Sequence, residues 1–219
     1  MAKPLMITIH HLGISQSDRV VWLMEELNLP YKLQWYDRGE DFLAPPEYRA
    51  LHPAATAPII DDGDVRLAES TAIVEYISQR HGQGKLSIPV DHKDYPHYLY
   101  WMQFNNNLQS TLFIKMAFQS MPAPADDNNP LMTTNQRRYE GFYNALEQRL
   151  GESDYLGGPV FSCADIMSTF NLTSLAMLGA RAIDDSLPNV QAYLQRITSR
   201  PAYKKAMAIA GLEAKRSES

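Results

Sequence analysis

The spacing of apolar residues changes once along this chain of 219 residues, and that change limits the folds it can adopt. Up to about residue 80, short extended patterns alternate with helical ones, whereas from Tyr95 onward helical patterns recur with little strand signal. A two-residue alternation is typical of half-buried strands, and a 3.6-residue period is typical of amphipathic helices. We therefore predict an α/β domain over residues 1–81, a linker over 82–94 and an all-helical domain over 95–219.

The first part of the chain has the pattern of a β-α-β unit. Leu5–His10 is an apolar run that predicts a strand, and Lys32–Tyr36 alternates as a second one. Between them, Val20–Asn28 has apolar residues at helical spacing, and Pro30 ends that pattern. Such a unit is expected to be right-handed, with its two strands parallel.

Two further short strands and a helix complete this domain. Ala57–Asp61 and Val65–Ala68 are extended runs separated by Asp62-Gly63-Asp64, which is a hairpin signal. A helical pattern through Ile73 and Ile77 follows, and a helical or loop segment joins the two halves. The order β-α-β-α-β-β-α is that of a thioredoxin-like domain.

The second part of the chain is predicted to be all helical. Asn105-Asn106-Asn107 interrupts its first apolar stripe, so these residues are expected either on a solvated face or in a ligand pocket. Ser162-Cys163-Ala164-Asp165 has the sequence of a capping box, and residues 122–130 are expected to form a polar loop. The apolar stripes that define the predicted helices are Trp101/Phe104/Leu108/Leu112, Tyr139/Phe142/Tyr143/Leu146 and Val190/Tyr193/Leu194/Ile197.

Composition excludes several classes of function. The net charge of −5 and the absence of a long basic run argue against nucleic-acid binding. A single cysteine, Cys163, excludes an internal disulfide and a cysteine-cluster metal site, and His10-His11 has no third ligand at a supporting spacing, so we expect no metal. Met1–Ile9 is too short for a signal peptide and no run approaches the roughly 18 apolar residues of a membrane span. We therefore expect a cytoplasmic protein that binds neither nucleic acid nor membrane.

Three groups in the first domain have the order of a known binding site. Ser15 follows the first strand, Pro58 precedes Ile59-Ile60, and Glu69-Ser70 opens the third helix. This order resembles the glutathione-binding domain of the glutathione S-transferases. The segment Ile14–Val20, with its serine four residues before an arginine, resembles the serine-type signature of the theta-related bacterial and fungal members.

The resemblance implies that Ser15 is the catalytic hydroxyl. It would donate a hydrogen bond to the glutathione sulfur, which favours the thiolate and lowers the pKa of the thiol. Lowering that pKa by about two units requires roughly 2.7 kcal/mol of differential stabilisation. The local sequence alone favours a helix-capping role for Ser15, and the domain context reverses that preference.

The resemblance also assigns the remaining contacts to glutathione. It implies that the Ala57–Pro58 bond is cis and that the backbone of Ala57 binds the cysteinyl part. It further implies that Ser70 binds the γ-glutamyl carboxylate at a helix start, where free N–H groups favour anions, and that Glu69 meets the ammonium group.

One segment departs from the family pattern. Residues 51–58 align with a pattern usually written H-P-x-G-K-x-P, in which Ala55 replaces the glycine and Thr56 replaces the lysine. That lysine pairs with the glycyl carboxylate of glutathione, and loss of one such bond costs about 1.5–3 kcal/mol. The residues that would compensate are Arg38, Arg49 or His52.

By this resemblance, the reaction is attack of the glutathione thiolate on a small hydrophobic electrophile. Glutathione is the co-substrate, the helical domain forms the pocket for the second substrate, and the protein is a homodimer. Two alternatives remain open: a non-catalytic binding protein with the transferase fold, and a glutathione-dependent reductase or peroxidase.

Overall fold

The structure is a computed structural model that describes residues 6–120, 129–175 and 180–216. The contacts between residues divide the chain into two compact units. The first unit comprises the chain up to Ser87 together with the segment from Ile197 to the C-terminus, and the second comprises Ile88–Arg196. The predicted loop over 122–130 lies mostly outside the described residues.

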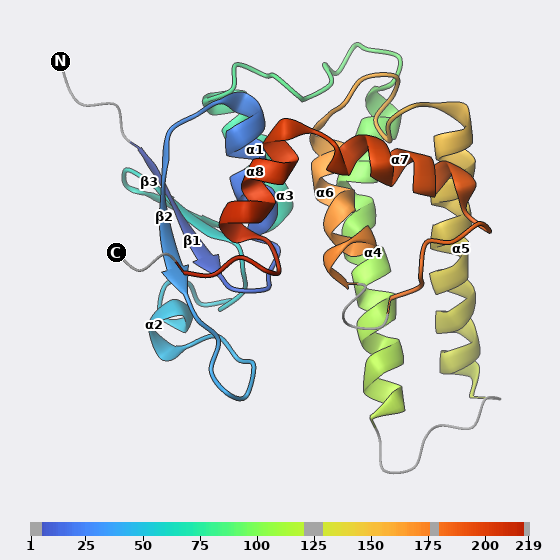
Figure 1. The fold of residues 1–219 in the computed structure, drawn as a ribbon, viewed down its shortest axis with the longest axis horizontal. Coiled ribbons are helices and arrows are strands. Elements are labelled where there is room, and N and C mark those ends of the chain that lie inside the picture. The colour runs from blue at the N-terminus through green and yellow to red at the C-terminus, as the bar shows by residue number, and fades with distance from the viewer. Residues whose placement is uncertain (1–5, 121–128, 176–179, 217–219) are drawn as a thin grey trace. The chain divides into compact units, whose positions relative to one another are not determined.

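The first unit is built around a mixed sheet of four strands in the order β2-β1-β3-β4 (Figure 1). β1 pairs with β2 in parallel, whereas β3 is antiparallel to both β1 and β4. Gly63, at a φ of 61°, lies in the predicted hairpin turn between β3 and β4. The elements up to the end of the sheet domain are β1 (Ile7–Leu12), α1 (Asp18–Leu27), β2 (Tyr31–Tyr36), α2 (Pro46–Arg49), β3 (Ile59–Asp62), β4 (Val65–Ala68) and α3 (Ser70–Arg80).

This element order is the predicted β-α-β-α-β-β-α order, and the structure therefore confirms the thioredoxin-like fold. The first strand lies two residues later than predicted. His10 and His11 are consequently inside β1, where both side chains are buried. The core between the sheet and α1 and α3 includes Ile9, Leu23 and Ile73, all fully buried.

The last helix belongs to the first unit, although the sequence assigns it to the helical domain. α8 (Pro201–Ala210) packs on α1, with the rings of Trp22 and Tyr203 in an edge-to-face contact at 5.0 Å. Just before α8, Arg200 forms a two-point ion pair with Glu26, each contact being 2.7 Å long. Burial of Trp22 therefore depends on Tyr203, which lies 181 residues further along the chain.

The second unit is helical, as predicted. α4 packs against both α5 and α6, and the apolar stripe through Trp101, Phe104 and Leu108 is buried. The predicted capping box is present at the start of α6, where the Asp165 carboxylate accepts a hydrogen bond from the backbone N–H of Ser162. The helices of this unit are α4 (Tyr95–Gln119), α5 (Pro130–Glu152), α6 (Cys163–Leu172) and α7 (Pro188–Thr198), the last of which crosses the unit boundary.

Of the three asparagines of α4, Asn106 and Asn107 fit the predicted solvated face and Asn105 fits neither alternative. Asn105 is fully buried, and Asn171 of α6 donates to its backbone and side-chain oxygens at 2.8 and 3.0 Å. Asn105 therefore joins two helices inside the unit, because a buried amide needs partners. Only Asn106 and Asn107 lie on a solvated face.

No helix in the described part of the chain combines the length and the apolar character needed to cross a membrane. Within the same residues, no group of histidine, cysteine and carboxylate side chains is arranged to hold a metal ion.

Candidate functional site

The predicted site residues gather at one edge of the sheet. His10 pairs with Ile59 in the antiparallel β1–β3 ladder, and Ile59 pairs with Ala68 in the β3–β4 ladder. The end of β1, the start of β3 and the end of β4 therefore lie side by side. The residues that follow or precede these strand ends are Ser15, Thr56, Ala57, Pro58, Glu69 and Ser70.

Three backbone positions at this edge have positive φ without being glycine. Their φ angles are 54° at Ile14, 51° at Ala55 and 73° at Glu69. Non-glycine residues rarely adopt this region, and a β-branched residue such as isoleucine does so at a real conformational cost. Each of the three immediately precedes a predicted site residue, namely Ser15, Thr56 or Ser70.

Ser15 lies in the turn between β1 and α1 and is 8% exposed. Its hydroxyl donates to the carbonyl oxygen of Leu12 at 2.7 Å, and its oxygen lies 2.7 Å from that of Ser17. The backbone N–H of Ser17 also donates to the Ser15 hydroxyl oxygen, at 3.3 Å. Ser17, not Ser15, directly precedes the first residue of α1, so Ser15 does not cap the helix.

The hydroxyl of Ser17 is in turn bonded to a histidine. Its oxygen lies 2.7 Å from Nδ1 of His11, and both residues are fully buried. The ring of His11 packs against Trp35, with 4.3 Å between the ring centroids. Burial lowers the pKa of His11 to about 4, so the imidazole is neutral at physiological pH.

Ser70 is the first residue of α3, and its side chain contacts the turn after β1. The Ser70 hydroxyl donates to Oε1 of Gln16 at 3.1 Å, and Arg19 donates to the same oxygen. Arg19 also donates to the Ser70 hydroxyl oxygen, at 3.3 Å. The N-cap residue of α3 is Glu69, which is exposed.

Arg19 brings a positive charge into this part of the molecule. It is 1% exposed, and burial lowers the pKa of its guanidinium to about 9, so it stays charged at neutral pH. The neighbouring Asp18 carboxylate acts in the opposite direction and favours the charged form. The first turn of α3 therefore lies beside a buried cation, which suits the binding of a carboxylate.

The Ala57–Pro58 peptide bond is cis, as the family resemblance implies. Pro58 is buried, and Ala57 packs against a cluster formed by Leu12, Tyr48, Ile59 and Ala68. Thr56 is exposed.

Arg38 is committed to holding the turn before Ser15. Its guanidinium donates to the carbonyl oxygens of Gly13 at 2.7 Å, Ile14 at 3.0 Å and Phe42 at 2.7 Å. Of the three basic residues considered for the glycyl carboxylate, Arg38 thus already has three backbone acceptors. His52 accepts a hydrogen bond from the Ala54 N–H at 3.2 Å, and Arg49 is exposed at the end of α2.

A cavity of about 290 Å³ adjoins the turn that carries Ser15. Gly13 and Ile14, which directly precede Ser15, line it together with Arg38 and Gly39. The apolar part of the lining comes from Ile14, Trp35, Phe42 and Leu212. Asp37 and Arg38 add charged groups, so the cavity presents both apolar and polar surface to a small molecule.

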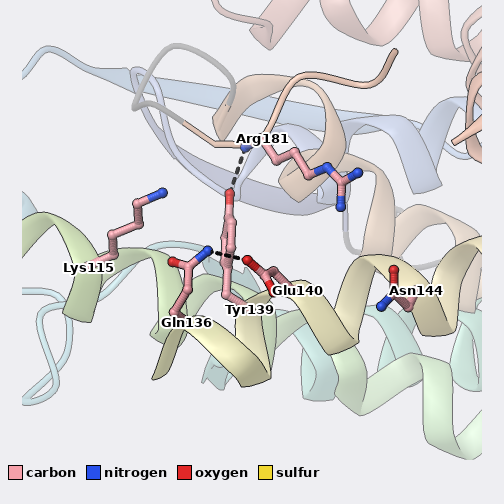
Figure 2. Close-up of a pocket in the computed structure, with 6 residues that line it drawn as sticks. All are labelled: Lys115, Gln136, Tyr139, Glu140, Asn144 and Arg181. Carbon is pink, nitrogen blue, oxygen red and sulfur yellow. Dashed lines mark hydrogen bonds between the residues drawn. The ribbon is translucent and has the colours of Figure 1, made fainter. Parts of the chain in front are cut away.

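A second cavity, of about 480 Å³, lies within the helical unit (Figure 2). The phenolic oxygen of Tyr139 accepts a hydrogen bond from the backbone N–H of Arg181 at 2.6 Å, and Nε2 of Gln136 donates to Glu140 at 2.8 Å. The other lining residues are Lys115 and Asn144. Charged and amide groups dominate this lining, so it does not match the apolar pocket expected for a hydrophobic second substrate.

The sequence misses two sets of residues at the site. Gln16 and Arg19 connect the Ser15 turn to Ser70, and His11 and Ser17 lie behind Ser15. The available signal was Asp18-Arg19, two adjacent charges at the start of a helix whose next residues are Val20 and Val21. Both charged residues are buried.

The fold and the site define a thioredoxin-like domain followed in the chain by a helical domain. Two family models match the chain: "Glutathione S-transferase, N-terminal domain" over residues 15–80 and "Glutathione S-transferase, C-terminal domain" over residues 110–201. The chain belongs to the glutathione S-transferase family.

Similar proteins come from fungi and bacteria. Glutathione S-transferase 3 of Schizosaccharomyces pombe is 40% identical over 100 residues, which are 46% of this chain and 41% of that protein. Glutathione S-transferase 1 of Saccharomyces cerevisiae is 28% identical over 93% of this chain and 94% of its own length. The crystal structure of a glutathione S-transferase from Actinobacillus pleuropneumoniae matches with a TM-score of 0.84 and 29% identity, covering 95% of both chains.

Proposed function

We propose that this protein conjugates the thiolate of glutathione to a small hydrophobic electrophile, with Ser15 as the hydroxyl that stabilises the thiolate. The observation that carries the proposal is the arrangement at the sheet edge: Ser15, the cis Ala57–Pro58 bond and Ser70 lie at neighbouring strand ends. A theta class glutathione S-transferase from Xanthomonas axonopodis pv. citri, solved with glutathione bound, shares the fold with a TM-score of 0.68 at 24% identity.

Each part of glutathione has a matching group at this edge. The γ-glutamyl carboxylate would bind at Ser70, where the charge of Arg19 and the start of α3 both favour an anion. Exposed Glu69 would meet the ammonium group, and the backbone of Ala57 would pair with the cysteinyl part. The glycyl carboxylate would lie toward Thr56, with Arg49 or His52 as its basic partner.

The sulfur would then face Ser15. The Ser15 hydroxyl donates to the Leu12 carbonyl at 2.7 Å, so its hydrogen has to rotate toward the sulfur while the oxygen stays in place. One hydrogen bond to a charged partner contributes about 1.5–3 kcal/mol, which corresponds to a fall of about one to two units in the pKa of the thiol. The thiolate then forms a carbon–sulfur bond with the electrophile, and the leaving group departs with the electron pair of the bond that breaks.

The electrophile would bind in the cavity beside Ile14, because its walls include Trp35, Phe42 and Leu212. Holding both reactants at one site removes the entropy cost of bringing them together in solution. We further propose that the protein is cytoplasmic and acts as a homodimer.

The test is to titrate glutathione against tryptophan fluorescence, to assay an activated aryl halide, and to read the pKa of bound glutathione by thiolate absorbance. We expect saturable binding, release of halide, and a bound-thiol pKa at least one unit higher in Ser15→Ala than in the wild type. Ser110→Ala, which removes an exposed serine of α4, is the matched control.

Binding without turnover would instead support the non-catalytic alternative. Turnover of a peroxide or disulfide but not of the halide would support the reductase or peroxidase. An unchanged thiol pKa in Ser15→Ala would remove Ser15 from the mechanism.

A further inference from the structure

The hydroxyl of Ser15 is one end of a buried chain of hydrogen bonds. Nδ1 of His11 lies 2.7 Å from the Ser17 hydroxyl oxygen, which lies 2.7 Å from the Ser15 hydroxyl oxygen. Ser15 then donates to the Leu12 carbonyl at 2.7 Å. His11 and Ser17 are fully buried and Ser15 is 8% exposed, so these groups bond to one another and not to bulk water.

The direction of this chain depends on which nitrogen of His11 carries the proton. The imidazole is neutral, so it has one N–H and one bare nitrogen. Nε2 is buried and has no hydrogen-bond partner within the described part of the chain, whereas Nδ1 has Ser17. A buried N–H without an acceptor is rarer in proteins than an acceptor without a donor. The favoured tautomer therefore has its proton on Nδ1, where it is donated to Ser17.

That tautomer fixes the role of each serine. Because the Ser17 oxygen accepts from His11, its own hydrogen goes to Ser15 at 2.7 Å and not to the Leu12 carbonyl at 3.4 Å. The Ser15 oxygen thus accepts from the Ser17 hydroxyl and also from the Ser17 N–H at 3.3 Å. A hydroxyl oxygen has two lone pairs, so Ser15 has no acceptor site left and can only donate.

We propose that His11 and Ser17 are positioning residues that make Ser15 an obligate hydrogen-bond donor and thereby select the thiolate of glutathione over the thiol. A thiol sulfur is only a weak acceptor and its S–H finds no free lone pair on Ser15, whereas a thiolate is a strong acceptor. Successive hydrogen bonds that point the same way also polarise one another, which strengthens the last donor. The inference rests on the proposed role of Ser15. It explains that role by the hydrogen bonds of His11 and Ser17, which do not touch the substrate.

The first test reads the tautomer of His11 directly in the wild-type protein. In protein labelled with ¹⁵N at histidine, the chemical shifts of His11 report which ring nitrogen is protonated, and His11→Asn identifies its signals. We expect a protonated Nδ1 and a bare Nε2 at neutral pH. A proton on Nε2 would make Ser17 the donor to His11, reverse the chain, and overturn the proposal.

The second test compares variants by the pKa of bound glutathione. Ser17→Ala breaks the chain, and we expect the thiol pKa to rise by about 0.5 unit, or about threefold less thiolate below that pKa. Ser17→Thr keeps the hydroxyl and should restore the wild-type value. His11→Leu should act like Ser17→Ala, whereas His11→Asn, whose amide nitrogen replaces Nδ1 as a donor, should not.

The outcomes separate this inference from the proposed function. If Ser15→Ala raises the thiol pKa but Ser17→Ala and His11→Leu leave it unchanged, Ser15 acts alone and the positioning role is wrong. If Ser15→Ala itself has no effect, the proposed function fails at Ser15. A loss of turnover in Ser17→Ala with an unchanged thiol pKa would indicate a structural role only, and would also overturn the inference.

Discussion

Nη1 of Arg19 lies 3.3 Å from the hydroxyl oxygen of Ser70, a residue 51 positions further along the chain. Arg19 is the second residue of α1, just after the Ser15 turn, whereas Ser70 begins α3, so this contact joins the two helix starts that face the candidate site. It also gives Ser70 a charged neighbour, which a serine at an ordinary helix start lacks. The Ser70 position is therefore suited to a carboxylate.

We predict that Ser70→Ala weakens glutathione binding by about 1–3 kcal/mol, because the carboxylate loses a charge-assisted hydrogen bond. Calorimetry measures the affinity directly. Cysteinylglycine lacks the γ-glutamyl group, so it should bind more weakly than glutathione. Its affinity should be the same for the wild type and for Ser70→Ala. If both ligands lose affinity equally, Ser70 does not bind the γ-glutamyl carboxylate.

The exposed position of Thr56 leads to a second prediction. Thr56→Lys should tighten glutathione binding by about 1 kcal/mol or less, because exposed ion pairs contribute little. The gain should shrink with added salt, since screening reaches about 10 Å at 0.1 M. γ-Glutamylcysteine, which lacks the glycine, should show no gain. Weaker binding of glutathione would mean that Arg49 or His52 already holds that carboxylate and that the new lysine repels it.

Much of this site can be predicted from local sequence. The contacts that could not be predicted share one physical reason. The turn with Ser15, the cis Ala57–Pro58 bond and the start of α3 all lie in short segments whose patterns resemble a known family. The contacts of Arg19 with Ser70 and of Glu26 with Arg200 join segments 51 and 174 residues apart. No local pattern specifies such pairs, because they form only when distant elements pack together.

His11 and Asn105 show the same limit for buried polar residues. In sequence, His11 is one of two histidines near a strand end, and Asn105 is one of three asparagines that break an apolar stripe. Both are fully buried in the structure, where each has a specific partner, Ser17 or Asn171. Hydropathy assigns such residues to the surface, since it does not include the hydrogen bonds that make their burial possible.

Ala55 offers a prediction about stability. Its φ of 51° lies in the left-handed region, where the family pattern has a glycine. Glycine adopts this region without the steric penalty of a Cβ atom, so Ala55→Gly should stabilise the protein by about 0.5–1 kcal/mol despite the greater freedom of glycine when unfolded. Urea denaturation followed by tryptophan fluorescence measures the change. Ala54→Gly, at an exposed neighbour outside the positive-φ set, is the matched control and should not stabilise.

The burial of His11 predicts how stability depends on pH. The pKa of His11 falls from 6.5 to about 4 in the folded protein because burial disfavours the charged ring. Between these values the unfolded chain binds a proton that the folded protein does not, so acid favours unfolding. The contribution of neutral His11 is fully present above pH 6.5 and is lost progressively as the pH falls toward 4.

We therefore expect the wild type to lose about 2 kcal/mol more unfolding free energy than His11→Asn between pH 7.5 and pH 5. Urea denaturation at the two pH values gives the difference, and comparison with the variant cancels the titration of all other groups. His97→Gln removes an exposed histidine of α4 and should lose as much stability as the wild type. Equal losses in the wild type and His11→Asn would mean that His11 accepts a proton inside the folded protein. The assignment of a neutral imidazole to His11, from which the hydrogen-bond chain to Ser15 begins, would then be wrong.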